Sequence, residues 1–119
     1  MIRDSSCRTY QLLIVLVRPA RIRVGRLGTF DFPAGRYAYT GSAGRHPAAR
    51  LRRHLSRNKR LHWHIDYLLA APEARVVGIR CFDAAECPVN RSMPGRIIIP
   101  GFGAGDCHAR CGSHLKFQS

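Results

Sequence analysis

The alternation of apolar and polar positions predicts three strands in the first third of the chain. Residues 10–17 form a continuous apolar run rich in branched side chains, which is typical of a buried central strand. Residues 21–24 alternate arginine with an aliphatic side chain, the pattern of a half-exposed strand with a basic face. The turn at Pro19 and Ala20 would pair this segment with the first run as a hairpin. Residues 36–40 alternate aromatic with small or polar side chains and predict a third strand.

The middle of the chain carries two helical patterns. Residues 48–57 have high helix propensity, and Pro47 stands where the first turn of a helix tolerates proline. Leu51 and Leu55 are four residues apart, so we expect both side chains to face the core. Residues 62–70 predict a second, shorter helix, which ends before the next proline.

The last third of the chain is less regular. Residues 75–82 predict a strand, and residues 84–91 predict a short helix with Asp83 as its N-cap. A last short strand is expected at residues 97–99, followed by a glycine-rich loop over residues 100–112. Strands and helices in this order predict an α+β or mixed α/β fold.

Composition limits the architecture and suggests a partner. The 119 residues suffice for one domain with a modest core, which we assign to residues 10–119 behind a tail of residues 1–9. A hydrophobic fraction of 45% argues against disorder. The net charge of +13 predicts a polyanionic partner. Of the 20 basic residues, 18 are arginine, which forks onto phosphate oxygens, although a GC-rich genome would produce the same bias.

The N-terminus and the cysteines indicate the compartment. Residues 1–9 lack the apolar stretch of a secretory signal, and the longest apolar run, residues 12–17, is far shorter than the ~20 residues of a membrane-spanning helix. We therefore expect a cytoplasmic protein with no membrane partner. The chain has five cysteines, and an odd count without an export signal predicts reduced thiols rather than a disulfide framework.

One ordered set of residues carries the strongest functional signal. Tyr39-Thr40-Gly41 is followed by a helical segment that holds Arg50 and His54, and this region reads GRYAYTGSA, then RLRRH, then HWHIDYLL. With the late stretches GFGAGDC and SHL, these motifs resemble the GIY-YIG nuclease superfamily and its Uri-type branch, over nearly the whole chain. The resemblance implies a central three-stranded antiparallel sheet flanked by helices, to which the pattern adds a C-terminal strand and loop extension. It also implies hydrolysis of a nucleic-acid phosphodiester with one divalent metal.

The resemblance assigns roles to individual residues. Tyr10 and Tyr39 would be the tyrosines of the two signature motifs, and one of them would act as the general base. Arg50 would stabilise the transition state, and His54 would position the attacking water or the phosphate. Glu86 would bind a single Mg or Mn ion. Chemistry requires the same parts, because phosphodiester hydrolysis needs a base to activate water, a cation beside the phosphoryl oxygens and a metal.

Basic residues gather on and just after the first predicted helix, and we expect them on its exposed side. A nucleic-acid backbone would have to lie beside Arg50, so these residues are candidates for phosphate contacts, and a merely solvated helix face is the alternative. DNA is favoured as the partner, with single-stranded and duplex forms both open. The candidates are Arg45, Arg52, Arg53, Arg57, Lys59 and Arg60.

A cluster of two histidines and an acid opens the second predicted helix. On a helix, His62 and Asp66 are neighbours four residues apart while His64 points elsewhere, so a single site with all three as ligands has poor geometry. We therefore favour a structural or substrate-positioning role for these residues over a metal site.

Cysteine and histidine residues near the C-terminus are candidates for a structural zinc site. Cys107, Cys111 and His114 are separated by three and two residues, and Cys87 could complete the set. The spacing is not a paired CxxC, so reduced buried thiols are the alternative. Asp106, in the same loop, is a second candidate ligand for the catalytic metal.

Three functions therefore stay open. The first is a metal-dependent endonuclease acting on DNA. The second is a non-catalytic or weakly active nucleic-acid-binding module of the same fold, which the first motif permits, since residues 8–10 read RTY and lack its glycine and isoleucine. The third is a zinc-stabilised interaction domain. Taken singly, each candidate has an ordinary structural explanation, such as a core tyrosine or an acidic residue favoured at a helix N-terminus.

Overall fold

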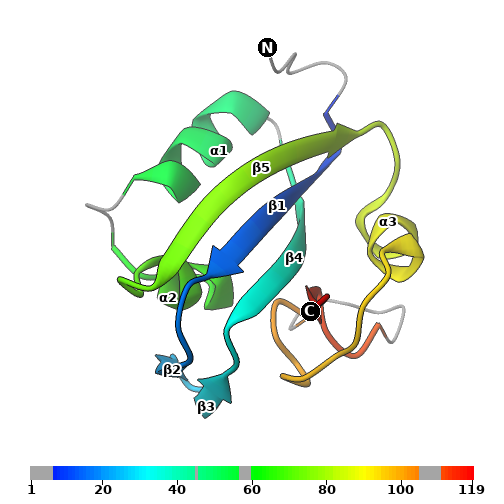
Figure 1. Ribbon diagram of the computed structural model, residues 1–119. Helices are drawn as coiled ribbons and strands as arrows, with labels where there is room; N and C mark the ends of the chain where they lie inside the picture. The colour runs from blue at the N-terminus through cyan, green and yellow to red at the C-terminus, as the bar shows by residue number, and fades with distance from the viewer. Residues whose placement is uncertain (1–6, 45, 57–59, 105–110) are drawn as a thin grey trace.

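Four antiparallel strands form the main sheet of the computed structural model, in the order β5-β1-β4-β6 (Figure 1). They are β1 (Thr9–Leu16), β4 (Gly35–Ser42), β5 (Ala74–Phe82) and β6 (Leu115–Phe117). The sheet therefore has four strands rather than the expected three. Strand β6 was not predicted, because its three residues are too few to show a period-two pattern. The structure describes residues 7–44, 46–56, 60–104 and 111–119.

A separate hairpin is formed by β2 (Ala20–Val24) and β3 (Gly28–Phe32). The prediction that residues 21–24 pair with the first strand is wrong. The reason is that β1 has β4 along one edge and β5 along the other, so it offers no backbone edge to a third neighbour. The turn of this hairpin uses Gly25, whose φ of +50° favours glycine over other residues.

Three helices lie beside the sheet in the described part of the chain. In Figure 1, α1 (Pro47–Leu55) and α2 (His64–Leu69) lie on one side of β1, and α3 (Glu86–Ser92) lies on the other. Lys116 on β6 reaches α3 through its ammonium group, which donates hydrogen bonds to the carbonyls of Asn90 and Met93 at 3.1 Å each. Among the described residues, no helix combines the length and apolar character that a membrane crossing requires.

Two predicted details near α3 differ from the structure. Asp83 is not the N-cap, because α3 begins at Glu86 after Ala85. The chain is still tied to the sheet before that point, where the Thr9 hydroxyl donates to the carbonyl of Ala84 at 2.6 Å. Residues 97–99, all of them described, do not form the predicted strand. An isolated bridge pairs Arg96, one residue earlier, with Phe117 of β6.

The core lies between the sheet and helices α1 and α2. Leu12, Ile14 and Leu51 are fully or almost fully buried there, as their apolar patterns predict. Leu55 is 53% exposed, which contradicts its expected inward orientation. It is the last residue of α1, and the buried position on that turn is taken instead by His54, which is 2% exposed.

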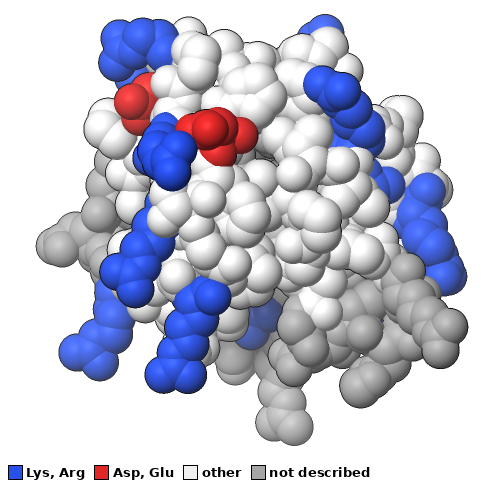
Figure 2. Space-filling model, turned by 90° about the horizontal axis from the view of Figure 1, so that it is seen from below, with Lys and Arg blue, Asp and Glu red and all other residues white. Residues whose placement is uncertain are grey.

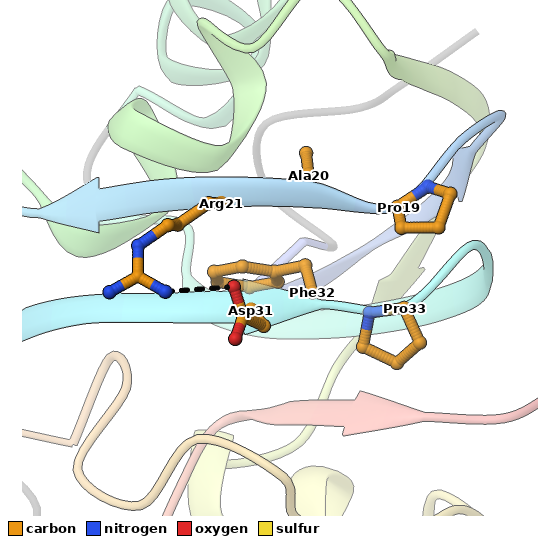
Figure 3. Close-up of a pocket in the computed structure, with 6 residues that line it drawn as sticks. All are labelled: Pro19, Ala20, Arg21, Asp31, Phe32 and Pro33. Atoms are coloured by element: carbon orange, nitrogen blue, oxygen red, sulfur yellow. Dashed lines mark hydrogen bonds and ion pairs between the residues drawn. The ribbon is translucent and has the colours of Figure 1, made fainter.

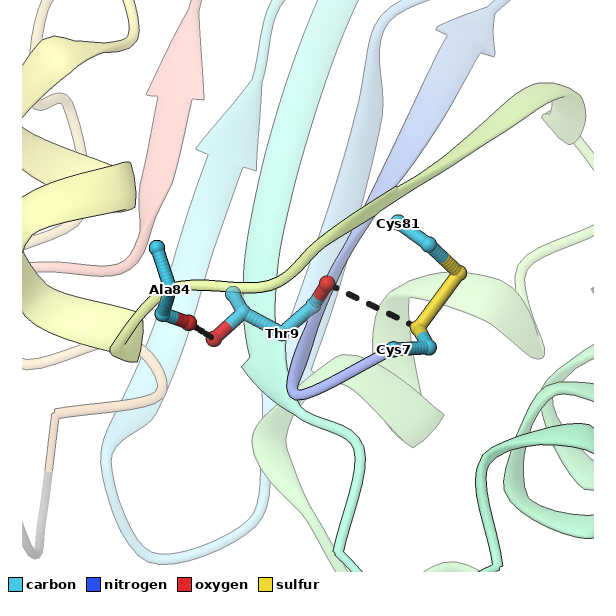
Figure 4. The surroundings of a disulfide bond; sticks show 4 residues. All are labelled: Cys7, Thr9, Cys81 and Ala84. Atoms are coloured by element: carbon cyan, nitrogen blue, oxygen red, sulfur yellow. Dashed lines mark hydrogen bonds between the residues drawn. A yellow bond between two sulfur atoms is a disulfide. The ribbon is translucent and has the colours of Figure 1, made fainter. Parts of the chain in front are cut away.

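A disulfide joins Cys7 to Cys81, so the expectation that all cysteines are reduced is wrong for this pair (Figure 4). The pairing of β1 with β5 places Thr9 opposite Phe82, and the two cysteines beside this pair have Cα atoms 5.1 Å apart. That separation lies within the range that a disulfide spans. The long sequence separation of the two cysteines hid their proximity from a reading of the chain.

A buried ion pair ties α1 to α2. Arg53 forks onto Asp66, with Nη1 to Oδ1 at 2.8 Å and Nη2 to Oδ2 at 2.9 Å. The Asp66 side chain is 0% exposed, and its Oδ2 also accepts the backbone N–H groups of His62 and Trp63 at 2.8 Å each. Burial alone would raise the pKa of Asp66, but the Arg53 and backbone hydrogen bonds together lower it below its usual value.

We expect Asp66→Asn to lower the free energy of unfolding by about 2 to 4 kcal/mol, because the partly buried guanidinium then faces a neutral amide. The pKa of Asp66 is depressed in the folded state, so its stabilisation is fully present above the pKa of the unfolded carboxyl, near ~4. It is lost as the pH falls through the lower folded value. Urea unfolding at neutral and acid pH should therefore show the difference between the two proteins narrowing with acidification.

The matched control is Asp31→Asn. Its carboxylate pairs with Arg21 at 3.4 Å, and the two side chains are 80% and 70% exposed. Exposed pairs of this kind contribute at most about 1 kcal/mol. Equal losses of stability in the two variants would contradict a structural role for the buried pair.

Candidate active site

Two tyrosines stand on neighbouring strands of the main sheet. The register pairs Tyr10 with Gly41 and Leu12 with Tyr39, so both tyrosine side chains point to the same face, diagonally across β1 and β4. Their ring centroids are 6.2 Å apart. Tyr10 is 2% exposed and Tyr39 is 7% exposed. The structure therefore brings together the two residues that the resemblance assigned to the signature motifs.

Gly41 makes this arrangement sterically possible. A Cβ atom at Gly41 would lie 2.6 Å from the hydroxyl oxygen of Tyr10 and 3.0 Å from Cε2 of Tyr39. Real Cβ atoms essentially never approach heavy atoms at the shorter of these distances. Only glycine at this position lets the Tyr10 ring lie across β4. The sequence motif contained Gly41, but its role depends on strand register and was not deduced from the sequence.

His54 reaches the first tyrosine from helix α1. Its Nε2 lies 2.5 Å from the hydroxyl of Tyr10, and the two ring centroids are 5.2 Å apart. Sequence reasoning expected His54 to position water or phosphate. In the structure His54 is 2% exposed and contacts the Tyr10 hydroxyl, and its role toward water or phosphate stays a prediction.

Arg50 belongs to α1, and its guanidinium reaches the end of β4 and stacks on an aromatic ring. Its Nη1 donates a hydrogen bond to the carbonyl of Ser42 at 2.6 Å. The guanidinium of Arg50 is 4.9 Å from the centre of the Trp63 ring, and that of Arg53 is 4.6 Å from it. Trp63 therefore holds two arginines through cation–π contacts. The contact between Trp63 and Arg50 was not predicted from the sequence.

Glu86 is the first residue of α3 and faces the C-terminal segment. Its Oε2 lies 2.7 Å from Nδ1 of His114, and its side chain is 30% exposed. The same Nδ1 lies 3.2 Å from the backbone carbonyl of Thr40, next to Tyr39 in β4. Glu86 is thereby held beside the strand that carries the second tyrosine.

The pKa shifts of the tyrosines show that Arg50 and Glu86 act on both hydroxyls. Burial raises the pKa of Tyr10 strongly, Tyr39 and Glu86 raise it further, and Arg50 opposes them. Burial also raises the pKa of Tyr39, the carboxylates of Glu86 and Asp66 add to this, and Tyr10 and Arg50 act in the opposite direction. Tyr10 and Tyr39 lie side by side, and the Arg50 guanidinium reaches the end of the strand that carries Tyr39. Glu86 is held beside the same strand through His114. Both tyrosines are protonated at neutral pH.

The candidate phosphate-contacting residues fall into different environments. Arg52 and Arg60 are exposed, as expected. Arg53 does not extend into solvent as expected. Its guanidinium binds Asp66 and also donates to the carbonyl of Arg60 at 2.8 Å. Three of the candidates lie outside the described residues, namely Arg45, Arg57 and Lys59.

The histidines and acid at the start of α2 have structural contacts. Asp66 binds Arg53 and the helix N-terminus, and His64 accepts the backbone N–H of Gly103 at its Nδ1, at 2.9 Å. Burial lowers the pKa of His64, which keeps the ring neutral. His62 is exposed. These contacts of His64 and Asp66 favour a structural role, as their sequence spacing suggested, over a metal site shared with His62.

The C-terminal cysteine and histidine residues do assemble. Cys87 on α3 meets Cys111 and His114, and the three ligand atoms all lie within 4.8 Å of one another. Cys107 and Asp106, the remaining candidates of this region, lie outside the described residues.

Sequence reasoning also missed the contacts that the glycine-rich segment makes with the site. Phe102 is 0% exposed and packs edge-on against Tyr39, with ring centroids 6.1 Å apart. A Cβ at Gly103 would lie 2.9 Å from Cε1 of Tyr39, and its φ of +65° also requires glycine. The sequence signal for these contacts is Phe102, an aromatic residue between two glycines.

A surface pocket lies away from these residues. It has a volume of about 410 Å³ and lies at the hairpin of β2 and β3, where the exposed Arg21–Asp31 pair spans the strands (Figure 3). No predicted site residue lines it. Its lining residues are Pro19, Ala20, Arg21, Asp31, Phe32 and Pro33.

Comparisons with known proteins identify a family. A family model described as "Domain of unknown function DUF123" matches residues 9–119, from the first residue of β1 to the end of the chain. No curated protein and no solved structure matches the chain. The chain therefore belongs to the DUF123 family.

Proposed function

We propose that this protein is a divalent-metal-dependent endonuclease that hydrolyses phosphodiester bonds in DNA. One geometric observation carries the proposal, since residues far apart in the sequence lie on or beside strand β4. Tyr10 and Tyr39 lie side by side, Arg50 donates to the carbonyl at the end of β4, and Glu86 is held beside β4 through His114. The resemblance of the sequence motifs to GIY-YIG nucleases supplies the reaction class. The geometry supports it by bringing a cation, a carboxylate and two hydroxyls together.

Arg50 is the group that stabilises the charge of the phosphoryl oxygens in this proposal. Its guanidinium is oriented by the Ser42 carbonyl and by the Trp63 ring before any substrate arrives. Preoriented donors of this kind stabilise a transition state without reorganising during the reaction. Arg50 is also half-exposed, so a phosphate can approach it.

Glu86 is the proposed ligand of the divalent cation. Its carboxylate is partly exposed, and its charge raises the pKa of both tyrosines, which identifies it as a source of negative potential in the site. Mg²⁺ prefers oxygen ligands and is commonly held by one or two carboxylates together with substrate phosphate and water. A single glutamate therefore fits this ion. When bound, the metal would polarise the phosphate and stabilise the leaving oxygen.

Tyr10 and His54 form the proposed route for a proton. Because the pKa of Tyr10 is raised, its phenolate is scarce at neutral pH, and an isolated Tyr10 is a weak base. The hydroxyl lies 2.5 Å from Nε2 of His54. As the attacking water transfers its proton to the Tyr10 oxygen, the Tyr10 proton moves to His54, so no charge accumulates on the buried tyrosine.

The surface charge suits a nucleic-acid substrate. The net charge is +13, and Figure 2 shows a face on which basic side chains extend at both margins while acidic ones appear only in its upper left part. Such a field attracts phosphate backbones independently of sequence and weakens as salt increases. Arg52 and Arg60, exposed on and after α1, would contact the backbone near Arg50.

A second candidate function is a non-catalytic nucleic-acid-binding module. The burial of Tyr10 and Tyr39, at 2% and 7% exposure, favours it, because a catalytic hydroxyl has to reach the substrate. The two functions share the basic surface and differ in whether metal-dependent cleavage occurs.

We expect Arg50→Ala to reduce DNA cleavage by about 100- to 1,000-fold, the loss typical of removing one preoriented transition-state donor. Glu86→Gln should reduce cleavage at any Mg or Mn concentration that supports the unmodified protein, because an amide oxygen carries no charge for the cation. The measurement is cleavage of labelled single-stranded and duplex DNA as a function of metal concentration.

Arg23→Ala is the charge-matched control for this assay. Arg23 is exposed on β2, so the substitution removes one positive charge without touching the site, and cleavage should change little. Cleavage that survives both Arg50→Ala and Glu86→Gln would refute the nuclease proposal. Salt-sensitive DNA binding without any metal-stimulated cleavage would select the binding module.

Gly41→Ala should disrupt the site through sterics alone. A methyl group at this position collides with the Tyr10 hydroxyl, so either the ring or strand β4 must move. We expect a loss of about 1 to 3 kcal/mol in the free energy of unfolding and, from misplacement of Tyr10, about 100-fold in cleavage. Chemical denaturation and the cleavage assay measure the two effects.

Gly78→Ala on β5 is the control for this variant. A Cβ there would lie 3.1 Å from Cδ1 of Leu13, the end of a flexible side chain that can shift. We expect both variants to lose some stability, but cleavage should fall only in Gly41→Ala. An active Gly41→Ala protein would show that the close approach of Tyr10 to β4 is not required for the reaction.

A further inference from the structure

We infer that Cys87, Cys111 and His114 bind a zinc ion that fixes α3, and with it Glu86, against the sheet. The ligand atoms of these three residues all lie within 4.8 Å of one another, and Sγ of Cys87 is 4.0 Å from Nε2 of His114. Ligands of a tetrahedral zinc ion lie about 3.6 to 3.8 Å apart, given Zn–N and Zn–S bonds of about 2.1 and 2.3 Å. Shifts of about 1 Å or less close this cluster around the ion.

The donor set selects the metal. Thiolate sulfur and imidazole nitrogen are donors that zinc prefers, whereas Mg²⁺ and Mn²⁺ prefer oxygen. Cys87 and Cys111 are partly buried and His114 is 1% exposed, so the ion would be shielded from bulk water. This site is therefore chemically distinct from the proposed catalytic cation at Glu86.

The second ring nitrogen of His114 is arranged as in a metal-bound histidine. Nδ1 lies 2.7 Å from Oε2 of Glu86 and 3.2 Å from the carbonyl of Thr40, both of which are acceptors. A proton on Nδ1 satisfies both contacts and leaves Nε2, the atom that faces Cys87, as a lone-pair donor. Metal-binding histidines characteristically direct their other nitrogen to a carboxylate or a backbone carbonyl.

Hydrogen bonds join α3 to the C-terminal segment in the part of the chain that the structure describes. Helix α3 has seven residues, which is too short to be stable on its own, and only Val89 and Asn90 of it are buried. Asn90 donates to the carbonyl of Ser113 at 2.9 Å, so α3 and the C-terminal segment meet through polar contacts. A zinc ion would join α3 to residues 111–114 more strongly than these hydrogen bonds do.

The ion also has a consequence for catalysis, which rests on the proposed nuclease function. Binding at Nε2 keeps the proton of His114 on Nδ1, and that N–H then orients the Glu86 carboxylate through Oε2. The zinc site thereby positions the ligand of the catalytic cation without touching the substrate. Glu86 is the link between the two sites.

The first test is metal analysis of the full chain purified without chelators. We expect one zinc ion per chain in the unmodified protein and a loss of stoichiometric zinc in Cys87→Ser and in Cys111→Ser. The double variant Cys7→Ser/Cys81→Ser is the matched control and should keep its zinc, because those cysteines are bonded to each other and are not part of the cluster. Replacing zinc by Co²⁺ should produce the visible absorption of a thiolate-bound cobalt.

The inference is overturned if the unmodified protein holds clearly less than one zinc per chain, or if a Cys87–Cys111 disulfide is found in it. It is also overturned if both cysteine variants keep stoichiometric zinc. Circular dichroism of each variant shows whether the sheet is still formed, and cobalt titration of the unmodified protein gives an answer even if a variant does not fold.

The second test separates the zinc site from the proposed reaction. Glu86→Gln should keep one zinc ion per chain while losing cleavage, and Cys111→Ser should require a higher Mg or Mn concentration for cleavage than the unmodified protein. Stoichiometric zinc in a protein that cleaves no DNA would refute the nuclease proposal and leave the zinc site standing. Unchanged metal dependence in a zinc-free, folded Cys111→Ser protein would refute the link through Glu86.

Discussion

The candidate site depends on one constraint, the register of β1 against β4. Because Tyr10 pairs with Gly41, the tyrosine ring can lie across the neighbouring strand, where any other residue would collide with its hydroxyl. The same register places Tyr39 two pairs further along and therefore on the same face. A shift by one residue would turn the side chains of one strand to the opposite face and separate the two hydroxyls.

Polar contacts then fix the elements around this pair. His54 joins α1 to the Tyr10 hydroxyl, and the buried pair of Arg53 with Asp66 joins α1 to α2. Trp63, at the start of α2, holds Arg50 over the end of β4. A buried carboxylate is costly unless it is paired, so these helices have few alternative positions. The arginine proposed to contact phosphate is thus oriented by the same contacts that stabilise the fold.

The opposite wall of the site comes from the C-terminal half of the chain. Phe102 and Gly103 pack on Tyr39, and His114 connects Glu86 to the backbone of Thr40. The cluster of sulfur and nitrogen atoms behind His114 lies on the far side of that histidine from Glu86. The proposed zinc cluster and the proposed catalytic carboxylate therefore share one imidazole ring, and the short helix α3 contributes a residue to each.

The sequence by itself determined the α+β class, the central apolar strand, the helix that carries Arg50 and His54, and the short helix that begins near Glu86, because these depend on local periodicity and propensity. Only the tertiary structure decided that residues 21–24 pair with β3, that Cys7 joins Cys81, that Arg53 binds Asp66, and that Cys87 meets Cys111 and His114. These contacts join segments through strand pairing and packing, which the order of residues along the chain does not encode locally. The candidate residues Tyr10, Tyr39, Arg50 and Glu86 were named from motifs, but their placement on or beside β4 is a property of the fold.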